Sequence, residues 1–120
     1  MAEFGKPRDV ARYVRNGKRE RITVSSTAKA LTASTYQIKA SAAANQYGAS
    51  DIMPIGAEIQ VQTEPINFVK DGTTATALLG FVAAANDIIY LNSLQEIQRF
   101  SAIRNGASDA TLEVLYFYGR

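Results

Sequence analysis

The most constraining feature of the sequence is the segment 56–71, GAEIQVQTEPINFVKD, in which apolar and polar side chains alternate. Ile59 and Val61 lie between glutamate and glutamine residues, which is the period of two expected of a half-buried β-strand. Pro65 interrupts the pattern, because proline has no N–H to donate to a neighbouring strand. A second apolar run containing Phe68 follows and ends at an Asp-Gly turn signal. The segment predicts two strands in a hairpin-like centre, with Ile59, Val61 and Phe68 in the core.

Short runs of the same kind, separated by turn signals, recur along the chain. Residues 27–37 are rich in Thr, Ser and Ala, and Leu31 and Tyr36 are the expected core anchors of this stretch. Ser93, with Glu96 three residues later, has the spacing of a capping box and predicts one helical turn. The Ala-rich segment 39–50 fits a short helix and a surface loop equally well. Further strands are predicted over residues 21–25, 87–91, 99–104 and 110–118. This pattern predicts an all-β fold, a single antiparallel β-sandwich or small barrel over residues 22–120.

The composition limits the chemistry that the chain can perform. Its 120 residues correspond to one domain, and they include no histidine and no cysteine. A Ser-His-Asp triad, a zinc site built from His or Cys, and disulfides are therefore excluded within this chain. The longest mostly apolar run, 77–85, is too short to cross a bilayer, and the N-terminus lacks the apolar core of a signal peptide. We expect a cytoplasmically made protein with no enzymatic activity, no cofactor and no membrane contact.

Charge is distributed unevenly along the chain. Residues 1–21 carry seven basic and three acidic residues, a net charge of +4, whereas residues 22–120 carry six basic and eight acidic residues, a net charge of −2. We interpret residues 1–21 as an extended basic arm on a mildly acidic body. Within the arm, a short helix over 10–15 capped by Asp9 and a hairpin turning at Asn16 and Gly17 are both compatible with the pattern.

The basic arm is a candidate partner-binding segment. Nucleic acid is a disfavoured partner, because the body is acidic and no nucleic-acid-binding signature is present. An acidic neighbouring protein suits the charge of the arm better. The residues expected to carry this contact are Phe4, Lys6, Arg8, Arg12, Tyr13, Arg15, Lys18 and Arg19.

Charged residues near the turns have a simple structural interpretation. Asp71, Asp87 and Asp109 each stand beside Gly, Asn or Ser, where an aspartate stabilises a turn by bonding the backbone. An ion site would need several of these carboxylates to converge, which spacing alone cannot decide. Arg99 and Arg104 are expected to cross-link the sheet by pairing with acidic groups such as Asp71 or Asp87, rather than to bind phosphate.

The last predicted strand, 110–118, is apolar on both faces near its end. Leu112 and Val114 begin one cleanly apolar face, whereas the opposite face becomes apolar only at Leu115. A single sheet face cannot bury both sides, so this end is expected near a subunit contact. The residues predicted to lie at that contact are Leu115, Tyr116, Phe117 and Tyr118.

Four segments carry a resemblance to a known group of proteins: ITVSSTAKALTASTY at 22–36, AEIQV at 57–61, DGTTAT at 71–76 followed by Gly80, and RFSAIRNG at 99–106. Together they resemble small β-sandwich proteins from the structural-gene clusters of tailed bacteriophages. In those relatives a proline usually stands where this chain has Ala75, which indicates a looser turn here. The match covers most of the body but not the arm, and its motifs are structural.

The resemblance implies a non-enzymatic virion protein present in many copies. The leading expectation is a capsid decoration or cement protein, which binds the major capsid protein on the virion surface through its arm and forms a homo-oligomer, with a trimer favoured by analogy. The alternative is a head–tail connector, tail or fibre-associated protein, with host-surface glycans as a further possible ligand. Copy number separates the two, since decoration requires hundreds of copies per particle and a connector about a dozen or fewer.

Overall fold

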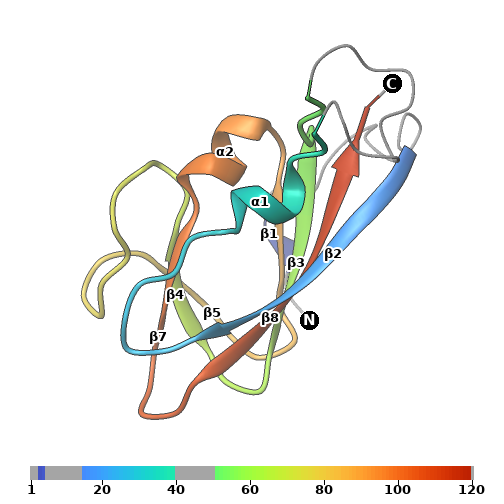
Figure 1. The fold of residues 1–120 in the computed structure, drawn as a ribbon. Helices are drawn as coiled ribbons and strands as arrows, with labels where there is room; N and C mark the ends of the chain where they lie inside the picture. The colour runs from blue at the N-terminus through green and yellow to red at the C-terminus, as the bar shows by residue number, and fades with distance from the viewer. Residues whose placement is uncertain (1–2, 5–14, 40–50, 120) are drawn as a thin grey trace.

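The computed structural model of the chain describes residues 3–4, 15–39 and 51–119. Two sheets pack face to face as a β-sandwich, and the described strands form no closed barrel (Figure 1). The strands are β1 (Glu3–Phe4), β2 (Arg15–Val24), β3 (Gly56–Gln62), β4 (Ile66–Val69), β5 (Phe81–Ala83), β6 (Ile88–Leu91), β7 (Ser101–Arg104) and β8 (Ala110–Tyr118). Two short helices, α1 (Ala33–Tyr36) and α2 (Leu94–Arg99), complete the described elements. The predicted all-β sandwich is confirmed.

The larger sheet has five strands in the order β1-β6-β3-β8-β2. Its pairs are antiparallel except for β1, which runs parallel to β6. The alternation of β3 and β8 gives this sheet one apolar face, on which Ile59 pairs with Val114 and Val61 with Leu112. All four of these side chains are buried, as the period-two pattern predicts.

The smaller sheet has three strands in the order β5-β4-β7, and it overturns the predicted central hairpin. β3 and β4 follow each other in sequence but do not pair, since β4 pairs with β5 and β7 instead. Thr63 adopts a positive φ of 70°, which turns the chain out of the ladder of β3. Pro65 then prevents continuous pairing, because it lacks a backbone donor. The turn therefore carries the chain from one sheet to the other.

The core fills the space between the two sheets. Phe68 of β4 is buried and its ring stacks on that of Phe100, with the ring centroids 6.1 Å apart. Tyr36 of α1 and Ile97 of α2 join the same cluster, and both helices close one end of the sandwich (Figure 1). The predicted core positions Leu31, Tyr36, Ile59, Val61 and Phe68 are all confirmed.

Helix α2 begins as the capping-box spacing predicts. Ser93 Oγ accepts a hydrogen bond of 3.2 Å from the backbone N–H of Glu96, and Glu96 Oε1 accepts one of 2.8 Å from the N–H of Asn92. These bonds satisfy backbone donors that the first helical turn leaves unpaired. The helix-or-loop alternative for 39–50 falls outside the described residues, apart from the exposed Lys39.

The first long strand begins earlier than predicted. β2 starts at Arg15, so residues 15–21 of the expected arm belong to the five-stranded sheet and pair with β8. Asn16 and Gly17 do not turn a hairpin. They lie where the register shifts between Arg15 and Lys18, at a β-bulge that a glycine accommodates readily. Residues 10–14 of the alternative helix lie outside the described part, and Arg15 is in a strand.

Candidate functional site

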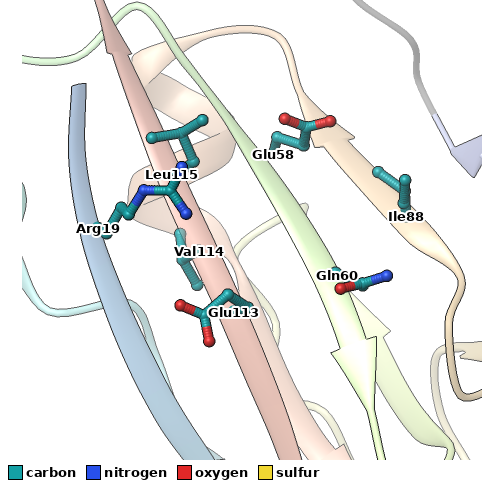
Figure 2. A pocket seen from close by; sticks show the side chains of 7 residues that line it. All are labelled: Arg19, Glu58, Gln60, Ile88, Glu113, Val114 and Leu115. Atoms are coloured by element: carbon teal, nitrogen blue, oxygen red, sulfur yellow. The ribbon is translucent and has the colours of Figure 1, made fainter. Parts of the chain in front are cut away.

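The outer face of the five-stranded sheet is a mixed-charge surface with a shallow depression. Two cross-strand rows form it, one joining Arg21 to Glu113 and Gln60, the other joining Arg19 to Leu115 and Glu58. Arg21 Nε lies 2.9 Å from Glu113 Oε2 in the first row. Figure 2 shows the Arg19 side chain reaching from β2 over β8. The depression is lined by Arg19, Glu58, Gln60, Ile88, Glu113, Val114 and Leu115.

The described residues of the predicted arm lie at opposite edges of this sheet. Phe4 belongs to β1, which pairs with β6 at one edge, while Arg15, Lys18 and Arg19 belong to β2 at the other. Arg19 is exposed and Lys18 is half-buried. The other predicted partner-binding residues, Lys6, Arg8, Arg12 and Tyr13, lie outside the described residues.

The four residues predicted for self-association do not share one surface. Tyr116 and Tyr118 have no exposed surface and face the core. The Tyr116 hydroxyl donates to the Glu20 carboxylate, and the Tyr118 hydroxyl donates to the backbone carbonyl of Tyr36. The alternation of β8 therefore leaves only Leu115 and Phe117, both half-buried, on the outer face, and the two tyrosines cannot form a direct subunit contact in this fold.

This tyrosine cluster has unusual electrostatics. Burial raises the pKa of Tyr118 to about 12, with the nearby Glu20 charge as the second cause. The pKa of Tyr116 is raised by burial, and further by its hydrogen bond to Glu20. Burial, and then the charge of Glu20, also raises the pKa of Tyr36. All three phenols are thus held neutral, as expected of hydroxyl groups packed beside a carboxylate.

Asp71 and Asp87 bond the backbone of their turns, as predicted, whereas Asp109 pairs with the Arg104 side chain. Asp71 Oδ1 accepts hydrogen bonds from the N–H and hydroxyl of Thr73, at 3.0 and 2.6 Å. These bonds, and to a smaller extent the charge of Arg99, lower the pKa of Asp71. Asp87 Oδ2 accepts a bond of 2.8 Å from the N–H of Ala84. Within the described part of the chain, no group of three or more acidic side chains could hold a metal ion.

Arg104 pairs with an acidic residue across a turn and not across its own sheet. Its Nη1 lies 2.8 Å from Asp109 Oδ1, across the turn between β7 and β8. Pairing with an acidic group is as predicted, but the acid is Asp109 and not one of the expected examples, Asp71 and Asp87, because the turn brings Asp109 close. Arg99 lies close enough to Asp71 to influence its pKa, in line with the predicted structural role.

Four large apolar side chains at the open edge of the smaller sheet and in the loop before it are exposed, a feature that the sequence patterns did not single out. Leu78 is 99% exposed, Leu79 51%, Phe81 70% and Val82 56%. We call these four residues the apolar ridge. They occupy the end of the loop before β5 and the first two residues of that edge strand. The sequence feature that could have indicated this exposed surface is the stretch 72–86, which contains no charged residue.

The apolar ridge is tied to the core by specific contacts. Gly80 has a φ of +131°, and a Cβ there would lie 2.9 Å from the carbonyl oxygen of Phe68. Asn67 is buried, and its side-chain amide donates to the carbonyls of Thr76 and Ala77 at 3.1 and 3.0 Å. Its Oδ1 accepts a bond of 2.7 Å from Asn105. The backbone that presents the ridge is therefore held in one shape.

Comparisons with models of protein families, with curated proteins and with solved structures found no match to this chain. No helix among the described residues is long and apolar enough to span a membrane.

Proposed function

We propose that this chain is a non-enzymatic structural protein of a tailed-bacteriophage virion, of the capsid decoration or cement class. It binds an acidic surface of the shell, formed by the major capsid protein, through its basic N-terminal region. The sequence resemblance of the body motivates the virion role. The observation that carries the mode of attachment is the position of the basic residues on an open edge strand.

β2 is the outermost strand on its side of the five-stranded sheet, so one of its two edges has no strand partner among the described residues. Residues 15–21 include four basic residues and one acidic residue, a net charge of +3 out of the +4 of residues 1–21. The acidic residue, Glu20, binds Tyr116 on the core side. Lys18, Arg19 and Arg21 are the remaining described charges of the edge; Arg21 is paired with Glu113, Lys18 is half-buried and Arg19 is exposed.

A basic edge held by a sheet suits an acidic protein surface. The side chains are presented by paired backbone, so less conformational entropy is lost on binding than with a segment that must first become ordered. Attraction between exposed charges weakens with salt, because the screening length falls to about 8 Å at physiological ionic strength. Binding through this edge should therefore be strongest at low salt.

The copy number in the particle tests this function. Virions of the phage that encodes the chain are purified, and the protein is counted by quantitative mass spectrometry and located by cryo-EM. Decoration predicts hundreds of copies on the outer shell, whereas about a dozen or fewer at the neck or tail would establish the connector alternative. Absence of the protein from purified virions would contradict both virion roles.

The attachment mode is tested on shells that lack the protein. Lys18→Glu combined with Arg19→Glu should reduce occupancy by about tenfold or more at low salt, by analogy with charge reversal at other electrostatic interfaces. Lys29→Glu, an exposed charge reversal away from β2, is the matched control and should bind normally. Removing residues 1–14 would take away β1 but leave β2 whole, so this truncation tests the segment before β2 separately from the basic edge. Full occupancy by the double variant would show that another surface attaches the protein.

A further inference from the structure

The open edges of the two sheets are protected to different degrees. β2 carries lysine, arginine and a β-bulge, devices that discourage another strand from pairing. β7 is covered in part by Lys29, whose backbone exchanges hydrogen bonds of 2.8 and 3.0 Å with Ala102. β5 is the outermost strand of its sheet, and no described strand pairs with its outer side. It carries no charge, and it holds half of the apolar ridge.

We propose that β5 and the apolar ridge form the contact with a second copy of this chain. The β5 strands of the two copies pair in an antiparallel manner about a two-fold axis near Val82, which joins the two three-stranded sheets into one continuous sheet. Side chains alternate along β5, so Phe81 and Val82 would meet the second copy on opposite faces of the joined sheet. The contact is isologous, so both copies use the same residues.

The first reason for choosing a second copy is the chemistry of the surface. The stretch 72–86 has no charged residue, so the ridge offers no charge by which to select an oppositely charged partner. An identical copy supplies an equally uncharged apolar surface. It also supplies an equally open strand edge, whose backbone groups match those of β5 in antiparallel pairing. The basic β2 edges would repel each other, which excludes them as the self-contact.

The second reason is the size of the ridge. Its four residues, at the exposures given above, present on the order of 400–500 Å² of mainly apolar surface. Two such surfaces would bury at most about 800–1,000 Å² in total, which only reaches the lower limit for a specific interface. The expected dimer is therefore weak, with a dissociation constant in the micromolar range.

Sedimentation velocity over a concentration series tests the contact. The wild-type protein should pass from monomer to dimer between about 1 μM and 1 mM. Leu78→Glu should weaken the dimer by tenfold or more, and it should leave the fold intact because Leu78 is 99% exposed. Leu115→Glu is the matched control on the outer face of the other sheet, where the new carboxylate would lie between Arg19 and Glu58. It should dimerise like the wild type.

A wild-type protein that stays monomeric at 1 mM would overturn the proposal. So would an oligomer that is unaffected by Leu78→Glu. A trimer disrupted by Leu115→Glu but not by Leu78→Glu would place self-association at the end of β8 instead. Binding of the ridge to the capsid protein, with no dimer in solution, would assign the ridge to that partner and also overturn the proposal.

Cross-linking tests the position of the two-fold axis. The chain has no cysteine, so a single introduced thiol can form a disulfide only between copies. Val82→Cys should give a covalent dimer under mild oxidation, because facing residues near the axis of an antiparallel pair bring their Cα atoms to about 4.5–5.5 Å. Thr23→Cys, exposed on β2, is the control and should stay monomeric. Equal yields would refute β5 pairing.

These experiments use the isolated chain and do not depend on the virion role. A protein that forms the dimer but is missing from purified virions would refute the proposed function and leave this inference standing. The reverse result would refute the inference alone.

Discussion

The strands β2 and β5 are both sheet edges, yet they meet solvent in opposite ways. β2 is ten residues long and carries Lys18, Arg19 and Arg21, with a bulge near its start. β5 is three residues long, uncharged, and begins with Phe81 and Val82, which are more than half exposed. A long edge strand would be an easy template for unwanted pairing, and charge and irregularity prevent this. The short apolar edge lacks such protection, as expected of an edge that is covered by a partner.

The two edge strands, β2 and β5, are also attached to the core in different ways. On β2, Glu20 is the inward-facing polar residue and binds Tyr116, so the strand is fixed from inside by a polar contact. On β5, Ala83 is buried while Phe81 contacts Phe68 with ring centroids 6.1 Å apart, at the margin of the core. If β5 is an open surface edge and β2 is fixed from inside, substitutions on the two sides of the sandwich should differ in their cost to stability.

Substitutions at the two neighbouring phenylalanines, Phe68 and Phe81, should show by their cost in unfolding free energy which residue is in the core and which is in the ridge. Phe68→Ala should lower the free energy of unfolding by about 3–5 kcal/mol, because a fully buried ring is lost. Phe81→Ala should cost less than about 1 kcal/mol in the monomer, because most of its surface is already exposed. Urea denaturation at low protein concentration measures both. Equal losses would mean that β5 belongs to the closed core and is not an open edge.

The backbone beneath the ridge should tolerate no side chain at Gly80. Gly80→Ala should destabilise the protein by about 1–3 kcal/mol, since the residue has a positive φ and the new Cβ would meet the Phe68 carbonyl. Gly106→Ala is the matched control, because a Cβ added there would meet no atom within 4 Å, and its effect should be within about 0.5 kcal/mol. Thermal unfolding compares them. Equal stability of the two variants would show that the ridge backbone is not held in this shape.

Alkaline pH should destabilise the fold, because it ionises the buried tyrosines of β8. The folded-state pKa of Tyr118 is raised from 10.0 to about 12, so its contribution to stability is complete below pH 10 and is lost as the pH rises through 12. The raised pKa of Tyr116 acts in the same direction. The melting temperature should therefore fall above pH 10.

Tyr118→Phe is the variant that isolates this effect. It should cost about 0.5–1.5 kcal/mol at neutral pH through the lost hydrogen bond to Tyr36. It should also make the decline above pH 10 shallower, and ultraviolet titration should show one late-ionising phenol fewer than in the wild type. An unchanged decline would show that Tyr118 does not cause the alkaline sensitivity.

The ion pair on the outer face of β2 should contribute least. Arg21 and Glu113 are 2.9 Å apart, but the Arg21 side chain is 68% exposed. A double-mutant cycle with Arg21→Gln and Glu113→Gln should give a coupling below about 1 kcal/mol that decreases with salt. A larger, salt-independent coupling would mean that the edge charges hold the fold together and are not available to a partner.

The period-two pattern identified most of the strands and their inward faces correctly. β8 has the predicted boundaries, and the buried side of β3 was given by Ile59 and Val61. Asp71 and Ser93 also have the local turn and cap roles that their neighbours predicted. These features depend on residues close in sequence, so a pattern is enough to reveal them.

The alternation of apolar and polar residues did not show which strands pair with each other or which apolar runs face solvent. The run at Ile66–Val69 looks like the second strand of a hairpin, yet Thr63 and Pro65 send it to the other sheet. β2 extends to Arg15 because β8 supplies a partner over that length, although its charged sequence favoured an arm. The apolar ridge was missed as a surface, because an apolar run does not itself show whether it faces the core or solvent.

Hydrogen exchange at two protein concentrations tests the central contrast between the edges most directly. At about 5 μM the backbone amides of Phe81–Ala83 that face the open side of β5 should exchange readily, and at about 1 mM they should be protected by pairing with a second copy. The amides of Lys18–Thr23 on β2 should exchange at the same rate at both concentrations. Concentration-dependent protection on β2, or none on β5, would contradict the account.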